Sequence, residues 1–293
     1  MAIGVIAFLG ISTLPLLGSI FKEISPSSEG TPAPLQTTSS AQQAELASQV
    51  KGYELVLQRE PENRTALKGL VEARLQMVQL KLADIKTVIE PLEKFVKLNP
   101  DETGYAIILA QAKQYTDDRE GSAQVYRSVL EAQPGNIQAL NGLTELLLAQ
   151  NRPEAAIGLL QDTLKTANQA NQIQPGSIDV TSVQLELGRV YVGQGRYAEA
   201  QAIYDTAIEG NQQDFRPLMA KGWMLQRQNK KDEAKVLFDS ALALAPARFK
   251  DQIKAEIQKF SSEASSTAEQ SSSDESSQPN PDDKGESSQD SSE

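Results

Sequence analysis

Few residues in this 293-residue chain could carry out chemistry, because it contains neither histidine nor cysteine. An imidazole base, a thiolate nucleophile and a cysteine or histidine metal cluster are therefore excluded. Adjacent carboxylates occur at Asp117-Asp118 and Asp282-Asp283. Neighbouring side chains diverge from the backbone, so we interpret the first pair as a solvated turn and the second as part of a flexible tail. The sequence predicts a protein that is not an enzyme and has no cofactor, no metal and no small-molecule substrate.

The net charge of −11 is concentrated at the C-terminal end. Residues 261–293 contain nine acidic residues, thirteen serines and one lysine, with almost no apolar side chains. Such a segment cannot bury enough surface to offset chain entropy, so we predict a disordered acidic tail. The tail either solubilises the protein or, when phosphorylated, contacts a basic partner. Residues 41–260 are nearly neutral, and without a basic face we expect no nucleic-acid binding.

The N-terminal residues 1–21 carry no charged side chain. About 20 helical residues span the hydrocarbon core of a bilayer, so residues 1–24 are predicted to form a transmembrane anchor. A cleaved signal peptide is the alternative, but no basic residue precedes the apolar run and its end lacks a small-x-small cleavage site. Lys22 is the one flanking cation, and the positive-inside rule then places the rest of the chain on the cytoplasmic side of a thylakoid or plasma membrane.

Residues 25–40 are rich in proline, serine and threonine and are predicted to be a flexible linker. Beyond them, a period of about 34 residues is clearest in two consecutive copies, 181–214 and 215–248. Numbered from the start of each copy, both have glycine at place 8, alanine at places 20 and 27, and an aromatic residue at place 24. These residues are Gly188, Ala200, Tyr204 and Ala207 in the first copy and Gly222, Ala234, Phe238 and Ala241 in the second.

This pattern resembles the tetratricopeptide repeat family, in which small residues let two antiparallel helices approach closely and large ones fill the space between successive pairs. The resemblance implies an all-α fold, a right-handed helical solenoid of about five repeats over residues 41–260. Looser copies and flanking helices complete it. The predicted units are a half-repeat at 41–63, repeats at 64–102, 103–136, 137–180, 181–214 and 215–248, and a capping helix at 249–260 with Phe249, Ile253, Ile257 and Phe260 on one face.

In this family the first helix of each repeat lines a concave groove, and the resemblance places residues of the last two copies there. They are Ser182, Leu185, Arg189, Val192, Gly193, Arg216, Met219, Trp223, Gln226 and Arg227. We predict protein binding by Arg189, Arg216, Met219, Trp223 and Arg227, since arginine recognises carboxylates and tryptophan anchors interfaces. The expected partner is an acidic or mixed peptide. Alternatively, the arginines are solvated and Trp223 belongs to the core.

The carboxylate clamp with which some relatives hold chaperone tails is not matched. Lys68 fits its first position, but Glu72, Ile108, Gln138 and Gly142 occupy the others. The layout of anchor, linker and repeats is similar to that of N-terminally anchored tetratricopeptide repeat proteins of cyanobacterial membranes, including the kind that interacts with protochlorophyllide oxidoreductase. The expected function is a membrane-anchored adaptor that holds a partner protein, such as a pigment-synthesis enzyme or a photosynthetic complex in assembly. A secreted or periplasmic interaction protein is the alternative, and an enzyme with an unrecognised site is a further one.

Overall fold

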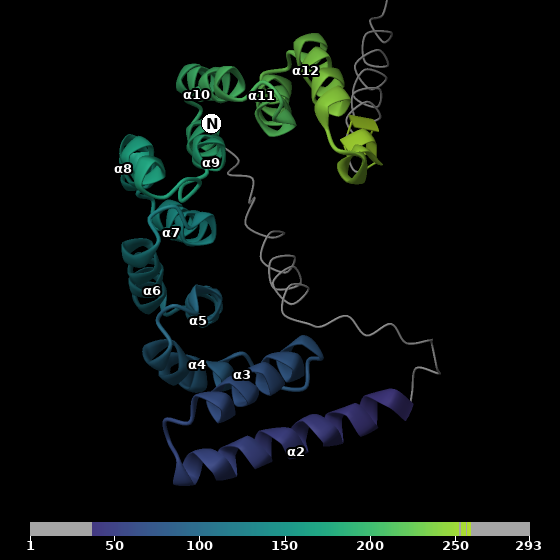
Figure 1. The fold of residues 1–293 in the computed structure, drawn as a ribbon. Coiled ribbons are helices and arrows are strands. Elements are labelled where there is room, and N and C mark those ends of the chain that lie inside the picture. The colour runs from purple at the N-terminus through teal and green to yellow at the C-terminus, as the bar shows by residue number, and fades with distance from the viewer. Residues whose placement is uncertain (1–36, 252, 256, 259–293) are drawn as a thin grey trace, which may run out of the picture.

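The computed structural model describes residues 37–251, 253–255 and 257–258, and these form helices joined by short turns. Successive helices follow an arc that runs from α2 to α12 (Figure 1). The elements are α2 (Thr37–Arg59), α3 (Arg64–Gln79), α4 (Lys86–Leu98), α5 (Thr103–Tyr115), α6 (Arg119–Ala132), α7 (Ile137–Ala149), α8 (Pro153–Ile173), α9 (Val180–Gly193), α10 (Tyr197–Gly210), α11 (Phe215–Arg227) and α12 (Lys231–Leu244).

The predicted anchor at 1–24, most of the linker and the acidic tail lie outside the described residues. Within the described ranges, no helix combines the length and the apolar character that crossing a membrane requires. The linker was expected to extend to residue 40, but α2 already begins at Thr37. Serine and threonine are favoured at the start of helices, so the Ser/Thr-rich residues 37–40 are compatible with the first turn of α2.

The ten helices from α3 to α12 form five consecutive hairpins, one within each of the five predicted repeat segments. The first helices α5, α7, α9 and α11 contact one another in sequence and lie on the inner side of the arc (Figure 1). The second helices of the described hairpins make no corresponding contacts with one another. The array therefore curves around its first helices, and their exposed faces form its concave surface.

A left-handed backbone residue ends the first helix of every hairpin. The amide that follows it donates a hydrogen bond of 2.8–3.0 Å to the carbonyl five residues earlier, as in Leu82 to Met77 and Arg196 to Tyr191. This bond satisfies a carbonyl that the helix end would leave free and reverses the chain within a few residues. The left-handed residues are Lys81, Asp117, Asn151, Gly195 and Asn229, with φ between 57° and 72°.

The last two hairpins each close where an aromatic ring lies against a glycine. The Tyr204 ring packs on Gly188 and the Phe238 ring packs on Gly222, so closely that a Cβ atom at either glycine would overlap the ring. The alanines at places 20 and 27 are at most 2% exposed: these are Ala200, Ala207, Ala234 and Ala241. The structure thus confirms an all-α array in which small residues permit the close approach of paired helices.

The core consists of two clusters of buried side chains that meet in α5. Ala106, Ile107 and Ala110 belong to the larger cluster, which extends from α5 to the C-terminal helical segment. Tyr105 and Ile108 belong to the smaller cluster, which α5 shares with α3 and α4. Helix α5 is buried on both faces because it joins these two parts of the array.

The extra residues of the 137–180 repeat lengthen α8 to 21 residues and form a loop that closes against the core. The Asn171 side chain holds this loop: its Nδ2 donates to Ile178 O at 2.9 Å, and its Oδ1 accepts from Ile178 N at 2.9 Å and from Ser177 Oγ at 3.1 Å. Ile178 is buried as a result. The insertion is therefore an ordered part of the array.

The helical segment that begins at residue 247 packs against the last hairpin. Phe249 lies against Phe215 of α11, with ring centroids 5.6 Å apart, and Ile253 is buried. Ile257 also packs against the core, whereas Phe260, predicted on the same face, lies outside the described residues. This segment covers apolar surface that the last hairpin would otherwise expose.

Replacing Gly188 with alanine should destabilise the protein, because the new methyl group overlaps the buried Tyr204 ring. Overpacking of this kind costs about 1–3 kcal/mol. Gly158 in α8 is the matched control: nothing lies within 4 Å of a Cβ atom there, so alanine should stabilise the helix by up to about 1 kcal/mol. Urea unfolding of both variants measures the difference. Equal stability of the two variants would show that the ring does not determine the helix spacing.

Candidate protein-binding groove

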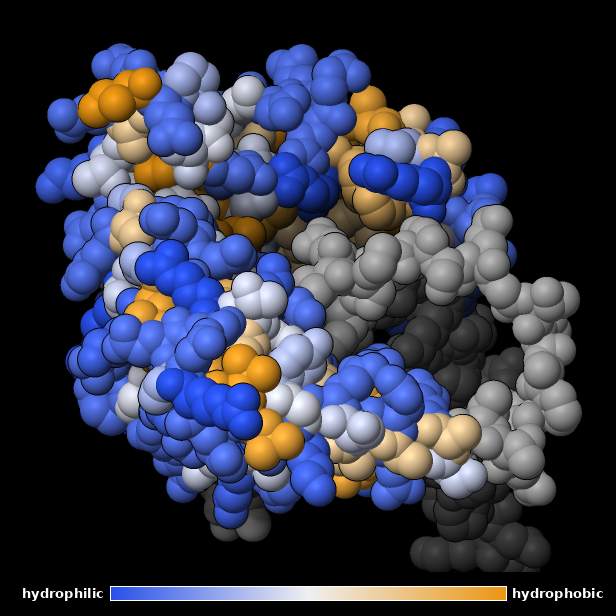
Figure 2. All heavy atoms as spheres, turned by 60° about the horizontal axis from the view of Figure 1, so that its bottom comes forward, coloured by the Kyte–Doolittle hydropathy of each residue, from blue (hydrophilic) through white to orange (hydrophobic). Residues whose placement is uncertain are grey.

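A groove of about 730 Å³ lies on the concave side of the array, between α7, α9, α11 and the C-terminal helical segment. Its polar groups come mainly from α9 and α11, and its apolar surface includes aromatic rings from three elements. The lining residues are Ile137, Asn141, Ser182, Leu185, Glu186, Arg189, Val192, Gly193, Tyr204, Phe215, Arg216, Met219, Ala220, Trp223, Met224, Arg227, Phe249 and Ile253. The face of the molecule drawn in Figure 2 is mostly hydrophilic, with scattered apolar side chains.

All five residues predicted to bind protein line this one groove: Arg189 from α9, and Arg216, Met219, Trp223 and Arg227 from α11. Their role in binding stays a prediction. Sequence reasoning missed the apolar contributions of Phe215, Phe249 and Ile253, since it treated the last helix only as a cap. It also missed Ile137 and Asn141, which reach the groove from the preceding repeat.

Trp223 presents one face to the groove. Its side chain is 41% exposed, which excludes the alternative that it belongs to the core. The ring of Phe238 lies beneath it, with centroids 6.4 Å apart and an interplanar angle of 58°. Met219 is only 4% exposed and forms part of the groove floor. A tryptophan held by a buried aromatic ring loses little side-chain entropy on binding, which favours its use as an anchor.

Arg189 is engaged by a carboxylate on its own helix. Its Nε donates to Glu186 Oε2 at 2.8 Å, and its Nη2 donates to Glu186 Oε1. The Glu186 side chain is only 8% exposed, whereas the Arg189 side chain is half-exposed, so the carboxylate of this bidentate pair is shielded from water by its position. The hydrogen bond from Arg189 to Glu186 raises the pKa of the guanidinium. Arg189 therefore offers a partner less than the full charge that the sequence predicted.

Arg216 is likewise engaged within the protein. Its Nη2 donates to Asp214 Oδ2 at 2.6 Å, and its Nη1 donates to Ser182 Oγ at 2.9 Å and lies 3.4 Å from Asp179 Oδ2. Asp214 and Asp179 are the N-cap residues of α11 and α9, so this arginine joins the starts of two successive first helices. Hydrogen bonding to Asp214 raises the pKa of Arg216.

Arg227 differs from both, because it makes no hydrogen bond or ion pair with any residue of the described ranges. It is solvent-exposed at the end of α11, one helical turn after Trp223. Residues four apart on a helix lie on the same face, so the Arg227 guanidinium and the Trp223 ring are neighbours in the groove. This pair is the part of the groove whose charge is available to a ligand.

A carboxylate near the other end of the groove reduces its positive character further. Glu145 of α7 lies close enough to Glu186 and Arg189 for both to influence it. Burial raises the pKa of Glu145, the charge of Arg189 opposes this rise, and the charge of Glu186 adds to it. Glu145 is an exposed residue, so its carboxyl group lies beside this end of the groove.

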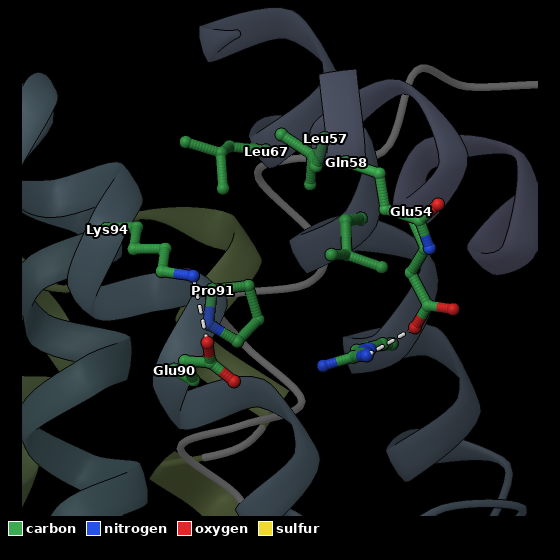
Figure 3. A pocket seen from close by; sticks show the side chains of 9 residues that line it. Glu54, Leu57, Gln58, Leu67, Glu90, Pro91 and Lys94 are labelled. Atoms are coloured by element: carbon green, nitrogen blue, oxygen red, sulfur yellow. Dashed lines mark hydrogen bonds and ion pairs between the residues drawn. The ribbon is translucent and has the colours of Figure 1, made fainter. Parts of the chain in front are cut away.

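A second cavity, of about 300 Å³, lies between α2, α3 and α4 (Figure 3), and a structural role explains it. Pro91 inside α4 has no amide hydrogen, so the Thr87 carbonyl four residues earlier loses its helical partner. Arg74 supplies one: its Nη1 donates to Thr87 O at 2.5 Å, and its Nη2 pairs with Glu54 at 2.6 Å. The polar groups of this cavity thus tie three helices together.

The adjacent acidic residues Asp117 and Asp118 occupy a turn, as predicted from the sequence. Asp117 is the left-handed residue after α5, and Asp118 caps α6 by accepting the amide of Gly121 at 3.0 Å. Asp282-Asp283 lies outside the described residues. In the part of the chain that the structure describes, no group of three or more acidic side chains is placed to hold a metal ion.

Comparison with known proteins identifies the repeats. Residues 109–176 and 185–248 each match a family model described as tetratricopeptide repeat. Cellulose synthase operon protein C of Pseudomonas fluorescens is 30% identical over 155 residues, or 51% of this chain and 12% of that protein. The beta-barrel assembly-enhancing protease of Yersinia pestis is 36% identical over 97 residues, or 33% of this chain and 17% of the protease. The chain thus spans less than a fifth of either relative.

Among solved structures, yeast Tom70 superposes with a TM-score of 0.51 at 12% identity, over 86% of this chain and 47% of that one. This similarity concerns the fold. Stacked hairpins around an open groove define a helical-repeat array. Two segments of this chain, residues 109–176 and 185–248, are similar to tetratricopeptide repeats.

Replacing Tyr204 with phenylalanine should reduce the decrease in the free energy of unfolding at alkaline pH. Burial raises the Tyr204 pKa to about 12, whereas an unfolded tyrosine titrates near ~10. The unfolded chain then binds fewer protons between these two values, so the stabilisation present below pH ~10 is lost as pH rises through the folded pKa.

The free energy of unfolding of Tyr204→Phe should fall less than that of the unmodified protein between pH ~10 and 12, by on the order of 2 kcal/mol. Urea unfolding at pH 8 is the control. At that pH the two proteins should have similar free energies of unfolding, because the aromatic ring at position 204 still packs on Gly188 in the variant. Parallel pH profiles would show that the hydroxyl titrates normally.

Proposed function

We propose that this protein is a membrane-anchored scaffold that holds a segment of a partner protein in its concave groove. The observation that carries the proposal is the convergence of Trp223, Met219 and Arg227 on one groove of about 730 Å³ lined by successive first helices. An exposed tryptophan beside an arginine that has no ion-pair partner in the described part of the chain is typical of protein-binding anchors. The tetratricopeptide repeats, which form interaction scaffolds, support this role.

The membrane part of the proposal is supported by the uncharged, apolar residues 1–21. A tether of this kind confines the partner to the membrane surface and raises its local concentration there. Lys22 favours a groove on the cytoplasmic side of a thylakoid or plasma membrane. The layout of anchor, linker and repeats favours a pigment-synthesis enzyme or a photosynthetic complex in assembly as the partner. A secreted or periplasmic interaction protein, released by signal cleavage, is the second candidate.

Combined replacement of Trp223 and Arg227 with alanine should reduce capture of the partner at least about tenfold, because anchors at the centre of an interface dominate its affinity. The measurement is the amount of each protein that co-purifies from detergent-solubilised membranes with the tagged chain. Arg189 and Arg216 stay intact in this design, since removing either would leave Glu186 or Asp214, each 8% exposed, without its counter-ion.

Val236→Ala is the matched control, because Val236 is a 65% exposed apolar residue on α12 that does not line the groove. The control should capture the same proteins in the same amounts as the unmodified chain. Undiminished capture by the double variant would contradict binding in the groove.

Deleting residues 1–24 should move the protein from the membrane fraction to the soluble fraction, since the deleted segment is the proposed anchor. Quantitative immunoblotting of both fractions after carbonate extraction measures this shift. N-terminal sequencing of the mature full-length protein separates the two candidate functions. A mature chain that begins beyond residue 24 would reject the anchor in favour of the secreted or periplasmic protein.

A further inference from the structure

Two of the three arginines that line the groove are neutralised within the protein. Arg189 and Arg216 stand against four carboxylates, of which Glu186 also lines the groove. The carboxylates belong to Glu145, Glu186, Asp179 and Asp214, and each influences Arg189 or Arg216 by a hydrogen bond, an ion pair or its charge. A strongly acidic segment would therefore meet as much repulsion as attraction over most of the groove.

Attraction for one negative group remains at the α11 end. Arg227 has no partner among the described residues, and its neighbour one turn earlier is the half-exposed Trp223. Beyond Trp223 the apolar surface continues through Met219 to the rings of Phe215 and Phe249 at the start of α11. A carboxylate placed on Arg227 would be followed directly by apolar surface, so the most favourable neighbour of that carboxylate is a bulky apolar side chain.

At the α7 end the groove offers a hydrogen-bond acceptor without a partner. The Oδ1 atom of Asn141 is buried and accepts no hydrogen bond from the described residues, although the side chain as a whole is partly exposed and lines the groove. An unsatisfied buried acceptor is costly, and a rotation of this side chain toward the groove would let a backbone N–H of a bound segment satisfy it. Since neighbouring helices pack about 8–10 Å apart, α7 and α11 are separated by roughly 20 Å. An extended segment of about six residues spans that distance.

We infer that the groove binds an extended segment of about six residues that carries a single carboxylate beside a bulky apolar or aromatic side chain. The carboxylate binds Arg227, the apolar side chain packs on Trp223, and the backbone donates a hydrogen bond to Asn141. This inference rests on the proposed function and specifies the chemistry of the partner. It excludes polyacidic segments as ligands of the groove.

Trp223 is the one tryptophan of the chain, so its fluorescence reports binding directly. The full chain is titrated with three end-blocked hexapeptides. The first contains leucine, phenylalanine and one aspartate, the second replaces that aspartate with asparagine, and the third contains four aspartates and no large apolar residue. The first peptide should bind roughly tenfold or more tightly than the second, the value of one hydrogen bond to a charged group. The third should bind more weakly than the first.

Arg227→Gln supplies the second half of a double-mutant cycle. It should weaken binding of the aspartate peptide by the same roughly tenfold factor and leave binding of the asparagine peptide unchanged. Asn141→Leu, which removes the acceptor, should weaken both of these peptides alike. Arg127→Gln is the control, because Arg127 is a half-exposed arginine of α6 that does not line the groove.

Three outcomes would overturn the inference. They are tighter binding of the four-aspartate peptide, equal binding of the aspartate and asparagine peptides, and no fluorescence change with any peptide. Failure here is distinguishable from failure of the proposed function. If the peptides fail but the Trp223 and Arg227 double variant loses its partner in the co-purification, the groove binds protein and only the inferred peptide chemistry is wrong. If the double variant retains its partner in the co-purification, the proposed function itself is wrong.

Discussion

The close approach of paired helices at residues without large side chains is the constraint on which the rest of this structure depends. An aromatic ring lies directly on a glycine where α9 meets α10 and where α11 meets α12. In the last hairpin the same ring, Phe238, also supports Trp223 from below. The Phe238 ring can take this position because Gly222 has no side chain. The same ring therefore determines both how α11 packs on α12 and how Trp223 is held at the concave surface.

Much of this arrangement could be predicted from the sequence, because it depends on residue size at fixed spacing. Gly188, Ala200, Tyr204 and Ala207 follow the repeat pattern, and the structure buries these small residues between helices as expected. The spacing also brought the predicted groove residues onto one surface, except Gln226, which does not line the groove. Helical periodicity fixes which side chains share a face, and the repeat fixes which faces line up.

The charge state of that surface was misjudged, although the sequence contained a signal. Glu186 precedes Arg189 by three residues on a helix, a spacing that brings opposite charges together. Asp214 is the capping residue of the helix on which Arg216 lies. Other features depend on contacts distant in sequence and could not be predicted locally. One is the binding of the Thr87 carbonyl by Arg74, which only the packing of α3 on α4 brings about.

Helix α5 gives the molecule an uneven architecture. Its two buried faces serve different clusters. On one face Tyr105 packs with α3 and α4, and its hydroxyl donates a hydrogen bond to Glu72 of α3 at 2.7 Å. On the other face Ala106, Ile107 and Ala110 belong to the cluster that extends to the groove. Stability in linear arrays is a sum of neighbour couplings, so the N-terminal hairpin is coupled to the groove-forming hairpins chiefly through this one helix. A substitution that disturbs both faces of α5 would therefore weaken the link between the two parts of the array.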